Sequence, residues 1–318
     1  MRRFLASAGA FGGLCLVAQC FAQQRPDIIP TPPIAGRWDL TVRAKSGDYP
    51  SWLEVKHSGY ATMVGHFVGR GGSVRPVSQV LWKDGAVKWS LPIQWEWMRK
   101  GDLRFEGRLV GDQLEGTTRD DEGTECTWVG VRAPSLQRKT APKWGQPVEV
   151  FNGKDLNGWQ SPSGPQHGWR LRDGLLVNAE PGTNLRTTAT FDDLKVHAEF
   201  RYPRGSNSGL YLRGRYEVQI QDDFGRAPSE LGLGSVYGHL KPRVSAARRA
   251  GEWQAMDVTL VGREITATLN GEPILERREI PGPTGGALDS NEGAPGPIML
   301  QGDHGPIEFR KLTVTRAQ

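Results

Sequence analysis

The chain has few cysteines, little net charge and no long internal apolar run. It contains three cysteines in 318 residues, and Cys126 has no partner once Cys15 and Cys20 leave with an N-terminal signal. We therefore expect a small buried side chain at Cys126, and neither a disulfide nor a cysteine metal centre. The formal charge is +5, or +3 without the two arginines of that signal. So small and evenly spread a charge argues against nucleic acid as a partner. Because no apolar run of about 18 residues follows the N-terminus, we expect no membrane span.

The N-terminus has the pattern of a cleaved export signal. Two arginines precede an apolar stretch, and Cys20 and Ala22 occupy the small-residue positions before a cleavage site. Gln19 disfavours a lipoprotein anchor on Cys20, because that position normally carries Gly, Ala or Ser. We expect a signal peptide over residues 1–22, export to the periplasm or the medium, and a Pro-rich extended leader over residues 23–33.

The rest of the chain lacks the 3.6-residue period of amphipathic helices and reads as short strands between Gly and Asp turns. We expect an all-β protein with a small barrel or sandwich of unknown role over residues 34–132 and a second all-β domain over residues 148–316. Residues 133–147 form a basic, aperiodic linker. The Gly/Pro-rich stretch Pro281–Pro297 is expected to be a mobile surface loop. An Asn-Gly pair in Leu269–Glu272 predicts a hairpin turn.

The strand boundaries follow from the turn residues. In the first domain we expect strands at Gly36–Arg43, Ser51–His57, Tyr60–Val68, Val77–Lys83, Ala86–Leu91, Leu103–Val110, Gln113–Asp120 and Thr124–Arg132. In the second domain we expect them at Glu149–Phe151, Trp169–Arg172, Leu175–Asn178, Leu194–Tyr202, Ser208–Gln221, Trp253–Val261, Glu264–Leu269, Pro297–Gln301 and Ile307–Thr315.

Four tryptophans of the first domain are candidates for stacking on sugar rings: Trp82, Trp89, Trp95 and Trp97. Strand alternation places Trp89, Trp95 and Trp97 on one face together with Ile93. Large aromatic side chains on one face of a strand more often fill a core than form a binding platform. We therefore expect core positions.

The strongest pattern is the alternation between residues 207 and 222, which predicts one long strand. The even positions are mainly apolar: Leu210, Leu212, Gly214, Tyr216, Val218 and Ile220. The odd positions carry groups that bond directionally: Asn207, Tyr211, Arg213, Arg215, Glu217, Gln219 and Gln221. Such a face is either solvated, as in many antiparallel sheets, or a sugar-binding groove. The directional groups favour the groove.

A three-residue turn over Arg204–Ser206 would pair this strand with the preceding one, which carries His197 and Glu199 on its polar face. Glu199 would then lie opposite Tyr211, and His197 opposite Arg213, with about 5 Å between β-carbons. We expect these side chains to share one face that spans a monosaccharide ring.

Several spaced motifs of the second domain occur in a characteristic order. They are Phe151–Trp159 (FNGKDLNGW), Asn207–Arg213 (NSGLYLR), Tyr216–Ile220 (YEVQI), Gly234–Gly238 (GSVYG) and Gly296–Gln301 (GPIMLQ). In these motifs residues 148–315 resemble the 3-keto-disaccharide hydrolase domain family. The resemblance implies a concanavalin-like jelly-roll β-sandwich and an enzyme that acts on glycosides oxidised at C3.

A ketone at C3 acidifies the C2 proton, so a base can remove it, the C1 group can be eliminated and water can add. Glu199 and Glu217 are the alternative bases, and Arg213 suits the developing enolate oxygen. The expected catalytic residues are Glu199, Arg213, Glu217 and Tyr237, with Tyr237 as the acid. The expected substrate-binding residues are His197, Asn207, Tyr211, Gln219, Asp222, Gln301 and His304.

Other interpretations of the same residues stay open. Ordinary hydrolysis by two carboxylates would use Glu199 with Glu217, or Glu217 with Asp222. A non-catalytic carbohydrate-binding module is a further alternative. Arg213 and Glu217 could instead form an exposed ion pair worth about 0–1 kcal/mol.

No organic cofactor is expected to be required. A separate dehydrogenase acting first would oxidise C3. Five potential metal ligands do not have the spacing of any recognised metal site: Asp222, Asp223, His239, Asp303 and His304. The sequence assigns no metal, and it leaves a structural Ca²⁺ open.

Overall fold

The computed structural model describes residues 31–59, 62–93, 101–120, 122–162, 164 and 168–318. These residues form 22 strands and no α-helix, which confirms the all-β prediction. Among them, no helix is long and apolar enough to cross a membrane. The expected signal peptide, most of the expected leader, Trp95 and Trp97 lie outside the described residues.

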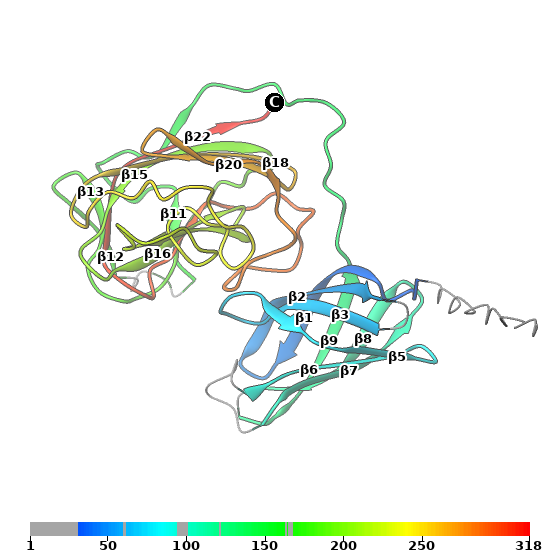
Figure 1. Cartoon of the computed structure of the whole chain (residues 1–318). Helices are drawn as coiled ribbons and strands as arrows, with labels where there is room; N and C mark the ends of the chain where they lie inside the picture. The colour runs from blue at the N-terminus through cyan, green and yellow to red at the C-terminus, as the bar shows by residue number, and fades with distance from the viewer. Residues whose placement is uncertain (1–30, 60–61, 94–100, 121, 163, 165–167) are drawn as a thin grey trace, which may run out of the picture.

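Nine strands form one sheet that curls into a nearly closed barrel, in the order β4-β3-β2-β1-β9-β8-β7-β6-β5 (Figure 1). We call it the N-terminal unit. Its strands are β1 (Gly36–Ala44), β2 (Gly47–Ser58), β3 (Thr62–Val68), β4 (Arg75–Val77), β5 (Val80–Lys83), β6 (Ala86–Leu91), β7 (Leu103–Val110), β8 (Gln113–Arg119) and β9 (Glu125–Arg132). The strand expected at Val77–Lys83 is replaced by the two short strands β4 and β5.

Aromatic side chains fill the interior of the N-terminal unit. Trp89 stacks on Phe105 with 4.8 Å between ring centroids, and it meets Trp128 edge-on at 5.3 Å. Trp82 is partly buried against the same core, and Cys126 is buried in it. The predicted core positions of Trp89 and Cys126 are confirmed, so Trp89 is not part of an exposed sugar platform.

Two facing sheets form a C-terminal unit, a jelly-roll sandwich of the predicted kind (Figure 1). The larger sheet contains β12 (Trp169–Arg172), β13 (Leu175–Asn178), β22 (Ile307–Arg316), β15 (Leu194–Arg201), β18 (Gln254–Val261), β19 (Glu264–Leu269) and β20 (Glu272–Glu279), with β10 (Val148–Phe151) beside β22. The smaller sheet contains β11 (Trp159–Gln160), β14 (Leu185–Thr187), β21 (Met299–Leu300), β16 (Asn207–Leu212) and β17 (Tyr216–Gln221). The Asn270-Gly271 turn joins β19 to β20 with positive φ angles at both residues, as predicted.

The segment predicted as one strand over residues 207–222 is a hairpin. Arg213 and Gly214 have φ angles of 51° and 66°, and they turn the chain back between β16 and β17. Tyr211 pairs with Glu217 across the hairpin. Because the register pairs odd residues with odd residues, the predicted division into polar and apolar faces survives on two adjacent strands.

The predicted pairing of β15 with β16 is wrong. β15 lies in the larger sheet between β18 and β22, whereas β16 lies in the smaller sheet between β17 and β21. The residues after β15 cross from one sheet to the other instead of making a hairpin turn. Glu199 therefore lies opposite Ala255 and not Tyr211.

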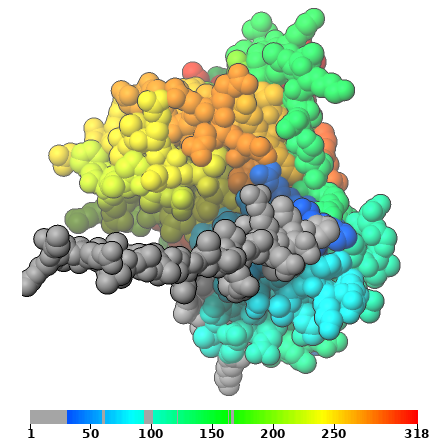
Figure 2. Space-filling model, turned by 45° about the vertical axis from the view of Figure 1, so that its right-hand side comes forward, coloured from blue at the N-terminus to red at the C-terminus, as the bar shows by residue number. Residues whose placement is uncertain are grey.

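The stretch Pro281–Pro297 joins β20 to β21 and packs against the N-terminal unit, so it is not the mobile surface loop that was predicted. Its Glu292 is fully buried and accepts a hydrogen bond from Tyr216 Oη at 2.7 Å. Gly282 lies against the Trp52 indole, where an added Cβ would be 2.3 Å from Nε1. The glycines of this stretch thus allow close packing. Figure 2 shows the N-terminal unit, in blue and cyan, directly against the C-terminal unit, in yellow and orange.

Two carboxyl groups meet inside this contact. Asp39 of β1 and Glu292 are both buried, and Arg263 donates to Glu292. Burial first, and then the Glu292 carboxylate, raise the pKa of Asp39 well above its usual range. Asp39 is therefore protonated at neutral pH and can donate to Glu292.

Asp39→Asn is expected to stabilise the protein at pH 8 and to change little at pH 4. Above pH ~4 the unfolded chain ionises this carboxyl while the folded chain keeps its proton, so wild-type stability falls as the pH rises. Asn removes this penalty and keeps a donor for Glu292. Calorimetry at both pH values should show a melting temperature higher by roughly 5 °C at pH 8 only. An equal change at pH 4 would contradict the protonated state of Asp39.

Candidate functional site

A cavity of about 220 Å³ opens where the smaller sheet faces the N-terminal unit. Its lining residues come from the β16–β17 hairpin, the segment after β21, three further loops of the C-terminal unit and the β3–β4 loop. They are Arg70, Gly71, Gly72, Asn184, Asn207, Tyr211, Glu217, Gln219, Tyr237, Gly285, Gly286, Gln301, Asp303 and His304. Seven of the eleven residues predicted for the site are therefore brought together.

Glu217 is the central ionisable group of this cavity. Its side chain is 3% exposed, and Tyr211 Oη lies 2.9 Å from Glu217 Oε2. An added Cβ on Gly209, which pairs with Gln219 across the hairpin, would be 2.2 Å from Glu217 Oε1, so the carboxyl fills space that only glycine leaves. Burial raises the pKa of Glu217 to about 8, against smaller lowering effects of the Tyr211 hydroxyl and His304. A carboxyl with this pKa suits proton transfer near neutral pH.

The Tyr211 hydroxyl connects Glu217 to the backbone of a C-terminal loop. Tyr211 Oη is 2.9 Å from the carbonyl oxygen of Gly285 as well as from the Glu217 carboxyl. A hydroxyl has one proton, so both contacts are satisfied when Glu217 is protonated and donates to Tyr211, which donates to Gly285. When Glu217 is ionised, Tyr211 must turn its proton toward the carboxylate.

Tyr211→Phe is expected to move the pH–rate profile to higher pH. The Tyr211 hydroxyl stabilises the ionised form of Glu217, so its removal raises the pKa of that carboxyl further. If Glu217 acts as a base, the ascending limb of kcat/KM should shift upward by about one pH unit, and the rate at pH 7 should fall roughly tenfold. A lower rate with the ascending limb of kcat/KM at an unchanged pH would show that Tyr211 does not act through Glu217.

Asp303 and His304 form a pair at the same cavity. His304 Nδ1 and Asp303 Oδ1 are 2.6 Å apart. This hydrogen bond lowers the pKa of Asp303 and raises the pKa of His304. The ring can therefore carry a proton while Asp303 fixes the Nδ1 side, leaving Nε2–H as a second donor. Tyr237, whose pKa is raised by burial and then by Glu217, adds a neutral hydroxyl.

The amide side chains of the cavity are incompletely satisfied by the protein. Asn207 Oδ1 and Gln301 Oε1 are buried without a hydrogen-bond partner among the described residues. The Gln219 amide is oriented so that its nitrogen donates to Ser208 O at 2.9 Å and Glu217 Oε1 at 3.3 Å, because the reverse orientation faces acceptor to acceptor. The two open acceptors suit hydroxyl donors of a ligand.

Glu199 and His197, both predicted for the site, lie outside it. They project from the larger sheet, where Glu199 accepts hydrogen bonds from Arg310 and pairs with His197 at 3.2 Å. His197 also contacts Asp257 at 2.8 Å. The predicted register, which would have brought them to Glu217, is the source of this error.

Arg213 and Asp222 also lie outside the cavity. Arg213 is fully buried at the hairpin turn, where it bonds Asp192 at 3.0 Å and Tyr216 Oη at 3.1 Å. Asp222 accepts from the backbone N–H of Gly205 at 2.8 Å and holds a turn. The interpretation of Arg213 and Glu217 as an exposed pair is also wrong, because both are buried and have other partners.

Sequence reasoning missed Arg70, Asn184 and Asp303 as lining residues. Arg70 and Asn184 belong to segments without any motif in the sequence, so no local signal marks them. Asp303 had been weighed only as a metal ligand, although it adjoins His304. No cluster of three potential metal ligands from His, Cys, Asp and Glu occurs within the described ranges.

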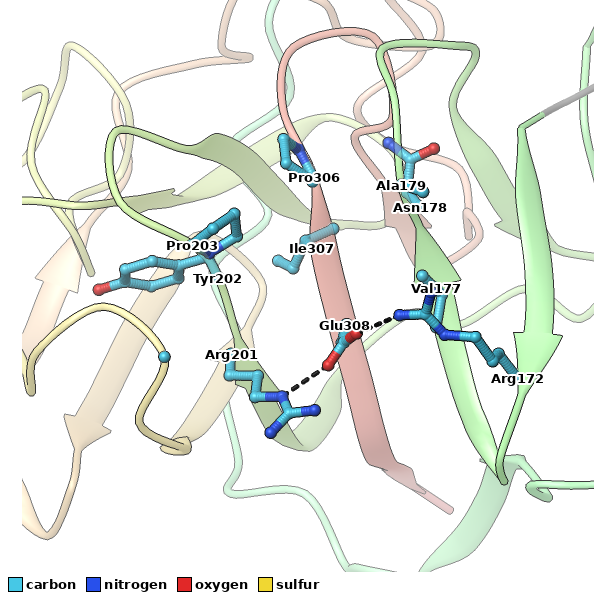
Figure 3. Close-up of a pocket in the computed structure, with 11 residues that line it drawn as sticks. Arg172, Val177, Asn178, Ala179, Arg201, Tyr202, Pro203, Pro306, Ile307 and Glu308 are labelled. Carbon is cyan, nitrogen blue, oxygen red and sulfur yellow. Dashed lines mark hydrogen bonds and ion pairs between the residues drawn. The ribbon is translucent and has the colours of Figure 1, made fainter.

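A second hollow, of about 360 Å³, lies at the larger sheet. Figure 3 shows its carboxylate, Glu308, between Arg201 and Arg172. Glu308 accepts from Arg201 Nε at 2.5 Å and from Arg172 Nη2 at 2.7 Å. Two guanidinium groups thus occupy the hydrogen-bonding oxygens of this carboxylate.

Two crystal structures from Parabacteroides distasonis ATCC 8503 are similar to this chain, and both carry a provisional designation as glycosyl hydrolases. One is 25% identical, covering 57% of this chain and 93% of its own, with a TM-score of 0.47. The other is 20% identical, covering 54% and 94%, with a TM-score of 0.46. No curated protein matched.

The family comparison covers most of the C-terminal unit. Residues 146–315 match the family described as the 3-keto-alpha-glucoside-1,2-lyase-like domain. That range contains every lining residue of the cavity except Arg70, Gly71 and Gly72. The predicted resemblance is confirmed: the chain belongs to the 3-keto-alpha-glucoside-1,2-lyase-like family of carbohydrate-active, glycoside-cleaving enzymes.

Proposed function

We propose that this enzyme cleaves the glycosidic bond of 3-keto-glucosides by elimination followed by hydration. The observation that carries the proposal is Glu217, a buried carboxyl with a pKa of about 8 that lines a cavity with unsatisfied amide oxygens. A base of this strength matches the removal of a proton made acidic by a neighbouring ketone.

In the proposed reaction, ionised Glu217 removes the proton from C2, and the electron pair forms an enolate with the C3 oxygen. The enolate collapses, expels the oxygen substituent of C1 and leaves a C1–C2 double bond conjugated to the ketone. Water then adds its hydroxyl to C1, and C2 regains a proton. The products are a 3-keto-sugar and a free alcohol or sugar.

Two other groups stabilise charge in this reaction. His304, positioned by Asp303, donates from Nε2 to the enolate oxygen at C3. Tyr237 supplies the proton to the departing oxygen. Asn207, Gln219 and Gln301 bond the ring hydroxyls. In this proposal His304 has the role of enolate stabiliser that was expected for Arg213. Glu217, and not Glu199, is the base.

The biological context is also part of the proposal. A ketone at C3 requires a preceding oxidation, which a separate dehydrogenase would perform. The N-terminal sequence pattern supports export from the cytoplasm with removal of a signal peptide.

The test uses a 3-keto-disaccharide, 3-keto-trehalose, beside unoxidised trehalose. We expect cleavage of the first only, and incorporation of solvent deuterium at C2 of the product in D₂O. Cleavage of 3-keto-trehalose without deuterium at C2 would contradict elimination. Absence of cleavage would contradict the substrate class.

Ordinary two-carboxylate hydrolysis is the second candidate, and one observation favours it. Glu217 has a raised pKa and Asp303 a lowered one, and both line the cavity. In glycosidases, two carboxyl groups with such different pKa values act as the acid and the base. The pairs Glu199 with Glu217 and Glu217 with Asp222 are ruled out, because Glu199 and Asp222 lie elsewhere. Cleavage of unoxidised trehalose without deuterium at C2 would support this candidate.

A further inference from the structure

One wall of the cavity comes from the N-terminal unit. Arg70, Gly71 and Gly72 belong to the loop between β3 and β4, and they line the cavity together with Glu217. They precede the family-matched range by more than seventy residues. The C-terminal sandwich alone therefore leaves the cavity open on this side.

The two units approach closely at this wall. An added Cβ on Gly285 would be 2.1 Å from the Gly72 carbonyl oxygen, and Gly286 N donates to Arg70 O at 3.2 Å. On the other side, an added Cβ on Gly238 would be 2.7 Å from Val74 N. Only glycine permits such contacts, so the β3–β4 loop is fitted to the sandwich.

The β3–β4 loop is linked to the proposed base, Glu217, through a chain of contacts. Gly285, which packs against Gly72, presents its carbonyl oxygen to the Tyr211 hydroxyl at 2.9 Å. Tyr211 in turn bonds Glu217. The contact between the units is thus part of the site.

Arg70 is exposed at the cavity and has free donor capacity. Its guanidinium group lies 3.4 Å from Ser46 Oγ and 5.6 Å from the centroid of the Tyr49 ring, and no described carboxylate pairs with it. A guanidinium group carries five donors in a planar fork that can bond two neighbouring oxygens at once.

The volume of the cavity indicates which part of a substrate would contact Arg70. A volume of about 220 Å³ is below the ~300–1,000 Å³ typical of pockets for drug-sized ligands. A cavity of this volume would enclose one sugar ring against Glu217 and leave the rest of a disaccharide at its opening. Arg70 is the charged residue that the N-terminal unit places there.

We propose that Arg70 binds the hydroxyl groups of the leaving sugar, so that the N-terminal unit sets the specificity for the leaving group. The inference rests on the proposed function. It assigns residues 34–132 a part in substrate recognition.

The experiment compares two substrates on the full chain, 3-keto-trehalose and methyl 3-keto-glucoside. Arg70→Ala should lower kcat/KM for 3-keto-trehalose about 30-fold, as for loss of a hydrogen bond to a charged group. The methyl glycoside, which has no leaving sugar, should change less than about threefold. Arg70→Lys keeps the positive charge but lacks the planar set of guanidinium donors. It should recover only part of the kcat/KM lost in Arg70→Ala.

Arg108→Ala is the matched control, because Arg108 is exposed on β7 of the same unit and does not line the cavity. It should leave both substrates unchanged. Equal effects of Arg70→Ala on both substrates, or no effect on either, would overturn the assignment of Arg70. A wild-type chain that cleaves neither substrate would instead overturn the proposed function, and with it the substrate class assumed here.

Discussion

Glu217→Gln is expected to lower kcat for 3-keto-glucoside cleavage about 10³-fold, within the range that general-base catalysis contributes. The amide has nearly the shape of the carboxyl and still accepts from the Tyr211 hydroxyl, so the cavity should keep its form. It cannot accept the C2 proton. Loss of a buried ionisable group with a pKa of about 8 should also abolish solvent deuterium incorporation at C2.

The matched control for this substitution is Glu199→Gln. Glu199 is the other carboxylate that the sequence suggested as a base, and it lies on the larger sheet beside Arg310. Its replacement should leave kcat within about twofold of wild type, since exposed ion pairs contribute little. If Glu199→Gln and Glu217→Gln lost activity equally, the cavity would not be the active site.

Arg213→Ala is expected to destabilise the fold by about 3 kcal/mol, the range for removal of one partner from a buried charged network. Arg213 has no exposed surface, and its guanidinium reaches Asp192, Tyr216 and the Gly262 carbonyl oxygen. Removal leaves an empty space beneath the hairpin turn and a Tyr216 hydroxyl with one partner fewer. Urea unfolding followed by tryptophan fluorescence measures the effect.

The same variant separates the two roles considered for Arg213. Where Arg213→Ala is still folded, its kcat/KM should stay within a few-fold of wild type, because the side chain does not line the cavity. Arg310→Ala, which removes an exposed guanidinium, should cost less than about 1 kcal/mol. A stable Arg213→Ala variant with a large loss of activity would restore the role expected from sequence.

The sequence predicted most of the strands, because local signals determine them, although β11, β14 and β20 were not predicted. Gly and Asp turns punctuate the first 132 residues, and strands such as Ala86–Leu91 and Leu103–Val110 have the expected bounds. The polar face containing Asn207, Tyr211, Glu217 and Gln219 was also found, since odd residues pair with odd residues in β16 and β17.

Long-range pairing could not be predicted in the same way. The sheet to which β15 belongs is fixed by β18 and β22, whose paired residues lie 54 to 122 positions away in the sequence. The hairpin turn at Arg213-Gly214 was hidden because Gly214 falls in the apolar row of the alternation. Arg70 lies 147 positions before Glu217 in a segment without a motif, and only the packing of the two units brings them to one cavity.

The buried contact between Asp39 and Glu292 joins two units that each have a hydrophobic core, and this contact has a thermodynamic consequence. A sugar that touches both Arg70 and Glu217 binds only when the units are docked, so its binding energy adds to the free energy of docking. A saturating ligand should therefore favour unfolding of the two units in a single thermal transition. By reciprocity, a substitution that loosens the docked state should weaken sugar affinity even from a position that the sugar never touches.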